Sequence, residues 1–481
     1  METSTRDTGM IWTLAAALAA LATWICFDAM PGINWPIWTA AGVAGLAYIV
    51  RKRSASNLVP AIGLMAVAAA AGAAFTASEL NIVLILFTVI VLLAVAMLLA
   101  TGQDIARITA WFTATAPVVA ISNVAVSGVK YAAGATSLIR SPRAQVALRA
   151  AAITLPVVIV FALLLSVADP TFARWRDAIE EILTNWNFLP RTIFFIVMLG
   201  FSLGVYGFAA HAPDSAPSAT PEPRRFLGSA ERLILTASVA GLLWLFLALQ
   251  LTYLFGNLPE VPGSGVTFAD YARRGFGEMT IVALATALLI VLTERFGIRD
   301  ERYRITRIMT FALIAAVLLL LISAFNRVLL YEEAYGYTTA RLYAKFFMIL
   351  IAVSLIALTI EVAGELDSGR LFRRVAATAF ALLITITWWN HEAWIAGKNI
   401  GRFATTGKLD ASYLVRDLSP DAIPTIVRLL PSLPEPARSE LQQLLVRRYD
   451  PTHPLLSDRR WFEWNRGRIE AREALRSLTV P

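Results

Sequence analysis

The stretch NIVLILFTVIVLLAVAMLLA, residues 81–100, carries no charged side chain over its whole length. An α-helix needs about 17–25 such apolar residues to cross about 30 Å of hydrocarbon. Because lipid offers no partners for open backbone N–H and C=O groups, a segment of this kind has to be helical. The stretch therefore predicts a membrane-spanning helix and indicates the fold class of the whole chain.

Comparable stretches recur along the chain. Of its 481 residues, 57% are hydrophobic and 16% are charged, whereas a soluble domain has roughly 25% charged residues. We predict spans at 10–27, 37–50, 58–77, 81–100, 146–167, 190–209, 231–255, 276–294, 307–326, 342–361 and 373–389. The predicted fold is all-α integral membrane, with these eleven transmembrane helices and a small extracytoplasmic C-terminal helical domain.

The segment 101–145 does not fit the pattern of a simple connection. Within 103–128, apolar residues fall at helical spacing on one face, among them Ile105, Ile108 and Phe112. This periodicity predicts an amphipathic helix on the inner membrane surface. The alternative is a twelfth span at 108–127, with Pro117 near its middle.

Basic residues indicate how the spans are oriented, since Lys and Arg are enriched in short cytoplasmic connections. One set of alternate connections is strongly basic, from Arg51-Lys52-Arg53 to Arg370, Arg373 and Arg374. The other connections hold only Arg174, Arg176, Arg273, Arg274, Arg327 and Arg341. We therefore predict a cytoplasmic N-terminus and an extracytoplasmic C-terminus in a bacterial cytoplasmic (inner) membrane.

The predicted organisation has six parts. They are transmembrane helices one to four at 1–100, the cytoplasmic amphipathic segment at 101–145, helices five and six at 146–209, a flexible cytoplasmic linker at 210–229, helices seven to eleven at 230–389, and the C-terminal helical domain at 390–481. The linker contains the Pro- and Ser-rich run HAPDSAPSATPEP. In the tail, Ser419-Pro420 predicts a capped helix start, and further helices are predicted at about 435–449 and 459–478.

Composition and motifs exclude several kinds of site. The single cysteine, Cys26, allows neither an intramolecular disulfide nor a thiolate cluster. His211, His391 and His453 have no second ligand at metal-binding spacing, so no metal and no cofactor is predicted. The net charge is +8, and the basic residues lie beside the apolar blocks. This distribution is typical of residues that orient membrane spans, and it argues against a nucleic-acid partner.

Ionisable and aromatic residues gather at the outer ends of the eighth to tenth spans. The candidate binding residues are Arg274, Glu278, Arg327, Tyr331, Glu333, Tyr335, Arg341 and Lys345. Charges near hydrocarbon usually face a helix bundle or a wet cavity. The alternatives are ordinary interfacial anchoring and an internal Glu278–Arg327 ion pair. Glu294 and Glu361, at inner ends beside arginines, are predicted to be salt-bridged helix caps.

Six segments of the chain resemble a known family. They are YARRGFGEM (271–279), AFNRVLLYEEAYGYTTARLYA (324–344), VADPTFARW (167–175), NHEAWIAGKNIGRF (390–403), LDASYLVRDLSPDAIPTIVRLL (409–430) and RRWFEWNRGRIEAREAL (459–475). Together they resemble bacterial membrane proteins of the domain-of-unknown-function family 4173 and its close relative 4153. That family usually has Asn-Pro where this chain has Asn390-His391. The resemblance implies a bacterial cytoplasmic-membrane protein and implies no reaction.

Three classes of function remain open. The first is a non-catalytic scaffold, envelope-assembly or sensing component. Its predicted partners are membrane lipids and an extracytoplasmic protein that binds the tail, 390–481. The second is a transporter or channel. The third is a membrane-embedded enzyme acting on lipid-linked or surface glycans, for which Asp28 would be the only acid of the first outer loop.

Overall fold

The structure, a computed structural model, describes residues 5–51, 58–100, 110–135, 154, 189–211, 225–254, 268–298, 303–449, 453 and 460–479. Within these ranges the regular elements are helices, and one isolated bridge pairs Leu227 with Gly297. Save for Thr154 and His211, the predicted span 146–167 and the run 211–223 lie outside the described residues. Contacts divide the chain into two compact units.

Unit 1 comprises Met1–Ser218 and Thr452–Arg472. Its helices are α1 (Thr5–Ile25), α2 (Asn34–Val50), α3 (Leu58–Ala71) with the 3-10 turn η1 (Gly72–Ala74), α4 (Glu79–Leu99), α5 (Ala110–Ala135) and α8 (Leu189–His211). Helix α8 packs against α1, α2 and α5, while α3 packs against α2 and α4. At the α5–α8 crossing, Gly204 lies against the Val124 carbonyl, where no larger side chain would fit.

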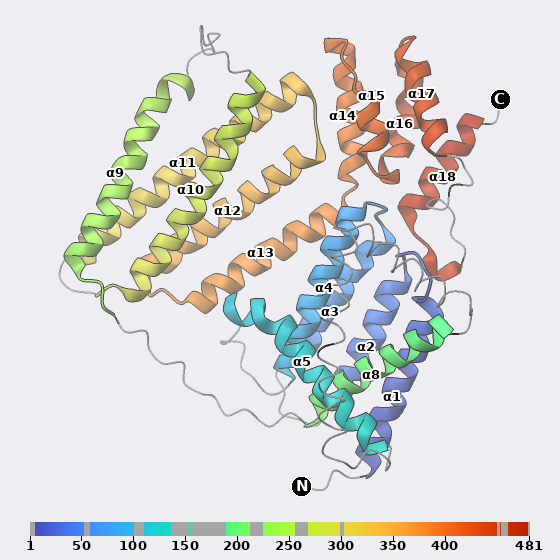
Figure 1. The fold of residues 1–481 in the computed structure, drawn as a ribbon. Helices are drawn as coiled ribbons and strands as arrows, with labels where there is room; N and C mark the ends of the chain where they lie inside the picture. The colour runs from blue at the N-terminus through green and yellow to red at the C-terminus, as the bar shows by residue number, and fades with distance from the viewer. Residues whose placement is uncertain are drawn as a thin grey trace. The chain divides into compact units, whose positions relative to one another are not determined.

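Unit 2 comprises Ala219–Pro451 and Glu473–Pro481. Its long helices are α9 (Ser229–Leu254), α10 (Phe268–Phe296), α11 (Tyr303–Tyr335), α12 (Thr339–Ala363) and α13 (Ser368–Trp388). Helix α11 packs against α9, α10 and α12, and α13 packs against α12 (Figure 1). Buried residues such as Val317 and Leu320 on α11 and Leu355 on α12 form the core of this bundle.

Shorter helices follow α13 in unit 2. They are α14 (His391–Thr406), α15 (Ala411–Arg416), η3 (Pro420–Ala422), α16 (Ile423–Leu429), η4 (Leu430–Ser432) and α17 (Ala437–Arg448). Ser419 accepts a hydrogen bond from the backbone N–H of Asp421 at 3.3 Å, with Pro420 at the first helical position, which confirms the predicted capped start. Helix α14 packs against α16, and α15 against α17.

The end of the tail contributes to unit 1. It contains η6 (Trp461–Glu463) and α18 (Arg466–Thr479), whose residues up to Arg472 belong to that unit. The amide of Asn465 donates to the carbonyls of Ala73 and Thr76, both at 2.8 Å. Arg468 donates to the carbonyl of Pro31 at 2.9 Å. Residues 390–481, treated above as one domain, therefore contribute to both units.

Among the described residues, eight helices are long and apolar enough to cross a membrane. They are Thr8–Ile25, Glu79–Leu99, Leu189–Ala210, Ser229–Leu249, Met279–Phe296, Tyr303–Tyr335, Thr339–Ala363 and Ser368–Trp388. Each coincides with a predicted span. Of the other three, 37–50 falls on the 17-residue α2, 58–77 on the shorter apolar helix Leu58–Ala74, and 146–167 lies almost wholly outside the described residues.

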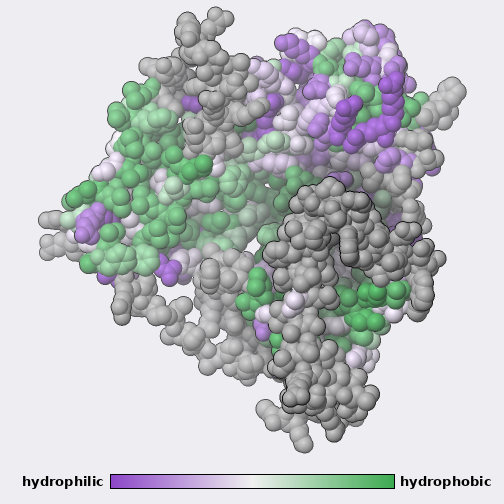
Figure 2. Space-filling view, in the orientation of Figure 1, coloured by the Kyte–Doolittle hydropathy of each residue, from purple (hydrophilic) through white to green (hydrophobic). Residues whose placement is uncertain are grey.

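The surface of unit 2 supports the membrane assignment. Large apolar side chains such as Ile234 and Leu242 on α9 and Ile281 on α10 are exposed. Figure 2 shows hydrophobic residues over α9–α12 and hydrophilic residues over α14–α17. Soluble monomers rarely expose a continuous apolar surface of this kind, so these faces fit contact with lipid.

Candidate functional site

The α11–α12 turn brings several of the predicted site residues together. Helix α11 ends at Tyr335 and α12 begins at Thr339, where the Thr338 hydroxyl accepts from the backbone N–H of Arg341 at 3.4 Å. Gly336 has φ +87°, in the left-handed region that glycine adopts without steric cost. A β-carbon at this position would also lie 2.8 Å from the side-chain oxygen of Asn399. The turn thus requires glycine for two reasons.

Lys345 forms a buried ion pair at this turn. Its Nζ lies 2.8 Å from Oε2 of Glu332, and the two residues are only 9% and 1% exposed. The Nζ also lies 5.6 Å from the ring centre of Trp394, within cation–π range. Glu332 was not among the predicted site residues, whereas its neighbour Glu333 was and is exposed. Burial makes the lysine and the glutamate depend on each other for charge compensation.

Three other predicted residues form an aromatic–cation stack. The Arg341 guanidinium lies 4.1 Å from the ring centre of Tyr331, and the Tyr331 and Tyr335 ring centres are 4.8 Å apart. Arg341 also donates to the carbonyl oxygen of Gly336. The side chain therefore closes the turn from within α12. The predicted positions Tyr331, Tyr335 and Arg341 lie together, and half-buried Arg327 is on the preceding part of α11.

The two remaining predicted residues are on α10. Helix α10 (Phe268–Phe296) includes Arg274 and Glu278, so the two residues lie four positions apart on one helix. Their side chains lie outside the described part of the chain. The Glu278–Arg327 ion pair therefore stays a prediction.

Tail residues that the sequence analysis did not select hold α14 against the turn. The Asn399 side chain accepts from the Tyr337 N–H at 2.7 Å and donates to the Tyr337 carbonyl at 2.8 Å. Arg402 donates to the carbonyl of Glu333 at 2.8 Å and to that of Ala334. Both residues lie in the NHEAWIAGKNIGRF segment. We call the Glu332–Lys345 pair, Asn399 and Arg402, with the 333–337 backbone that Asn399 and Arg402 contact, the turn–tail clamp.

A second layer of contacts surrounds the start of α14. His391, the first residue of α14, is buried, and its Nε2 lies 3.0 Å from the Tyr343 hydroxyl. The Tyr413 hydroxyl accepts from the backbone N–H of Thr339 at 2.8 Å. Burial raises the pKa of Tyr413 above its ordinary value. These contacts join α12, α14 and α15 within unit 2.

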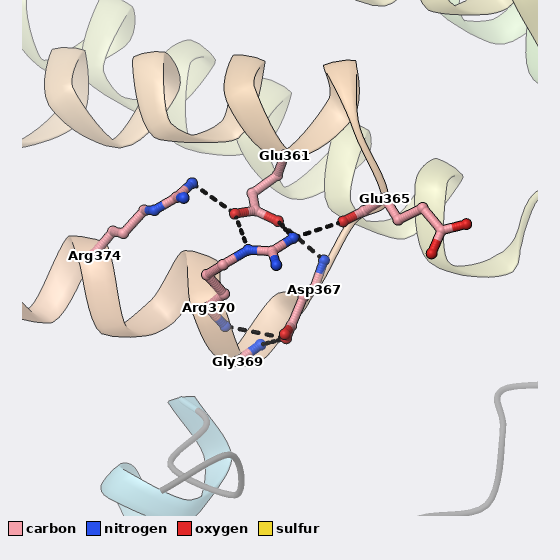
Figure 3. A network of polar contacts seen from close by, with 6 residues as sticks. All are labelled: Glu361, Glu365, Asp367, Gly369, Arg370 and Arg374. Atoms are coloured by element: carbon pink, nitrogen blue, oxygen red, sulfur yellow. Dashed lines mark hydrogen bonds and ion pairs between the residues drawn. The ribbon is translucent and has the colours of Figure 1, made fainter.

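The far end of α12 carries a different cluster (Figure 3). Buried Glu361 accepts two hydrogen bonds from Arg370, both at 2.8 Å, and one from Arg374 at 2.6 Å. Both arginines belong to α13, so the carboxylate joins the two helices across their connection. In the same bundle, buried Glu294 of α10 pairs with Arg232 of α9. The prediction that Glu294 and Glu361 are salt-bridged is confirmed.

Chemically, the turn–tail clamp offers fixed hydrogen bonds and one buried ion pair. Among the described residues, Oε1 of Glu332 has no hydrogen-bond partner. Across the residues that the structure describes, no group of three or more His, Cys, Asp or Glu side chains is placed to hold a metal ion. The arrangement is suited to joining helices, and it leaves one buried carboxylate oxygen, Oε1 of Glu332, able to accept a further hydrogen bond.

Comparisons with known proteins identify one related family. A family model described as "Domain of unknown function (DUF4153)" matches residues 59–429, which run from within α3 to the end of α16 and include the turn–tail clamp. This is the close relative named in the sequence resemblance, and a match to 4173 itself is not shown. No curated protein matches the chain. No solved structure matches it either.

Proposed function

This chain belongs to the DUF4153 family, whose description assigns no activity, and from that premise we propose that it is a non-catalytic scaffold, envelope-assembly or sensing component. Its apolar helices anchor it in the bacterial cytoplasmic membrane. Helices α14–α17 form a polar platform on the extracytoplasmic side, where a partner protein of the cell envelope binds.

The turn–tail clamp is the observation that carries this proposal. Asn399 and Arg402 of α14 are bonded to backbone groups of the α11–α12 turn, and Tyr413 of α15 to that of α12. Side chains that bond to backbone fix an orientation, because the carbonyl and N–H positions are set by the helix ends. The predicted outer mouth thus has contacts suited to mounting the tail rigidly on the membrane bundle.

Tail contacts within each unit support one location for the tail. In unit 1, Arg468 and Asn465 contact Pro31 and Thr76, in connections that arginine bias predicts to be outside. In unit 2, the tail contacts the turn at Tyr337, also predicted to be outside. Between these two contact regions the tail has no described helix longer than the 12-residue α17, which is too short to cross a bilayer.

The same reasoning bears on α5. If the tail stays on one side, the chain between Thr76 and Tyr337 crosses the membrane an even number of times. Six predicted spans lie in that interval: 81–100, 146–167, 190–209, 231–255, 276–294 and 307–326. A crossing by α5 would make the number odd. We therefore propose eleven spans, with both ends of α5 on the cytoplasmic side.

The surface of α15–α17 fits a protein partner. It exposes basic residues, including Arg416, Arg438 and Arg447, interspersed with the acidic residues Asp417 and Glu440. Interspersed charges of both signs favour specific, oriented association over general attraction to a polyanion. The partner we infer is a folded envelope protein with a complementary charge pattern.

Cross-linking in intact cells tests this function. The wild-type chain is compared with the Arg438→Glu/Arg447→Glu variant on α17 and with Arg304→Glu, an exposed arginine at the start of α11, as the matched control. We expect the α17 variant alone to lose a defined cross-linked partner while its melting temperature in detergent is unchanged. Identical cross-linked species in all three chains would contradict the proposed function.

A transporter or channel is the second candidate, favoured by the buried Glu332–Lys345 pair with one carboxylate oxygen lacking a described partner. Purified protein in liposomes containing a pH-sensitive dye would then show proton flux that the Glu332→Gln/Lys345→Met variant loses. For the enzyme candidate, Asp28 is exposed and ion-pairs with Arg460 at 3.6 Å. That contact supports a role in tail attachment.

A further inference from the structure

Within unit 1, the tail residues 460–464 are bonded to the connection between α1 and α2. The backbone carbonyl of Trp464 accepts from the N–H of Ile33 at 3.1 Å. Arg460 donates to the carbonyl of Phe27 at 3.1 Å. With Asn465 bonded to the η1 region, residues 460–465 lie against the end of α1, the start of α2 and the α3–α4 connection. This segment has a fixed orientation.

Within that fixed segment, side chains divide sharply by exposure. Phe462 is 3% exposed, and Glu463 and Asn465 are buried as well. Trp461, by contrast, is 62% exposed and Trp464 is 40% exposed. Two large indole rings are thus turned outward next to three buried residues. Exposing this much aromatic area to bulk water forgoes the stabilisation that its burial would give.

The outward tryptophans join other exposed apolar side chains of unit 1. Trp24, at the last turn of α1, is 58% exposed, and its ring centre lies 6.2 Å from that of Trp461. The ring centres of Phe75 and Trp464 are 6.5 Å apart. Near the start of α4, which is long and apolar enough to cross a membrane, Val83 is also exposed. The aromatic cluster therefore marks the boundary between an apolar helix surface and a polar tail.

We propose that Trp24, Phe75, Trp461 and Trp464 form a lipid-binding surface that inserts into the headgroup–acyl boundary of the outer leaflet. Indole rings prefer this zone because their apolar body contacts acyl chains while the N–H reaches water or headgroups. The occupant is the bilayer itself, because Trp24 lies at the end of α1 and Phe75 shortly before α4, and both helices are long and apolar enough to cross a membrane. The tail is then attached to lipid as well as to the helix ends.

Site-specific fluorescence in nanodiscs tests this surface. On a Cys26→Ala background, Trp461→Cys is labelled with an environment-sensitive fluorophore. Two matched positions calibrate it: Phe87→Cys, exposed on the middle of α4, and Ser432→Cys, exposed in the polar tail. Each protein is reconstituted with phosphatidylcholine–phosphatidylglycerol lipids bearing a nitroxide at acyl carbon 5 or carbon 12.

For position 461 we expect blue-shifted emission and about twofold stronger quenching by the carbon-5 nitroxide than by the carbon-12 nitroxide, as for groups at the boundary about 5–10 Å deep. Position 87 should show the reverse preference and position 432 no quenching. Should Trp461→Cys fail to fold, Trp464→Cys carries the label.

Two results would overturn the proposal. One is a label at 461 as water-accessible as that at 432. The other is a label that is shielded yet insensitive to both nitroxide lipids, since protein would then cover the surface. Because the readout concerns lipid contact alone, it is independent of whether α17 binds a partner.

Discussion

Two buried carboxylates in unit 2, Glu332 near the end of α11 and Glu361 near the end of α12, obtain their compensating charge in different ways. Glu332 meets a single ammonium, that of Lys345, which is itself buried. Glu361 meets two guanidinium groups, those of Arg370 and Arg374, whose side chains remain nearly half exposed. The first pair depends wholly on its internal partner, whereas water shares the charge of the second cluster. The same residue type therefore carries a different energetic weight at the two positions.

The largest effect is expected from removing one member of the buried pair. Lys345→Ala leaves the Glu332 carboxylate without its counter-ion in a buried site, which should cost roughly 3–5 kcal/mol of unfolding free energy. The measurement is the heat-induced unfolding midpoint in detergent micelles. Replacing both charges, as in Glu332→Leu/Lys345→Met, should recover most of the loss. A single variant that melts like the wild type would show that water reaches the pair.

Glu361→Gln should have a smaller effect than Lys345→Ala. The amide keeps an acceptor oxygen, and the exposed arginines can turn to water, so we expect a loss of about 1–3 kcal/mol. The same melting assay applies, with Glu440→Gln on the exposed face of α17 as the matched control. If Glu361→Gln were the more damaging of the two substitutions, the proposed contrast between Glu332 and Glu361 would be wrong.

Asn399→Ala tests the contact between α14 and the turn. It removes both hydrogen bonds with Tyr337, for an expected loss of about 1–2 kcal/mol. Limited proteolysis of the tail should also become faster, because α14 loses its fixed orientation. The adjacent exposed residue supplies the control, Lys398→Ala, which should change neither readout. Equal effects of the two substitutions would indicate that Asn399 does not hold the tail.

The smallest effect is expected at Asp367, which caps α13 beside the Glu361 cluster. Its carboxylate accepts from the N–H groups of Gly369 and Arg370, at 2.8 and 3.1 Å. The hydrogen bond from Arg370, followed by that from Gly369, holds the pKa of Asp367 below its ordinary 3.8. Asp367→Ala should cost about 1 kcal/mol.

The pH dependence at Asp367 has a definite sign. Because the pKa is lowered in the folded state, its contribution to stability is present above pH 3.8 and is lost as the pH falls through the folded value. In Asp367→Asn, the amide oxygen can still accept the capping hydrogen bonds, but the side chain no longer titrates. Melting curves of this variant should therefore show a weaker decline below pH 4 than those of the wild type. Parallel declines would assign the acid sensitivity to other groups.

Hydropathy was sufficient to predict the eight apolar helices because a helix in contact with lipid needs a long run of apolar residues. It could not select between Glu332 and Glu333, adjacent residues of one type, since the phase of α11 decides which faces Lys345. The partners Asn399 and Tyr337 are 62 residues apart. Tyr337 lies in the α11–α12 turn and Asn399 on α14, and no local sequence pattern indicates that they meet. The tail residues of the clamp were therefore not predicted.

The division of the chain has a consequence for biogenesis. Residues 460–472 complete unit 1, yet they are synthesised after the whole of Ala219–Pro451. The connections at Pro31 and Thr76 therefore stay uncovered while most of unit 2 leaves the ribosome. A chain cut short near residue 450 would present these bare helix ends to membrane proteases. The contact made by Asn465 therefore forms only after residues 219–451 have been synthesised.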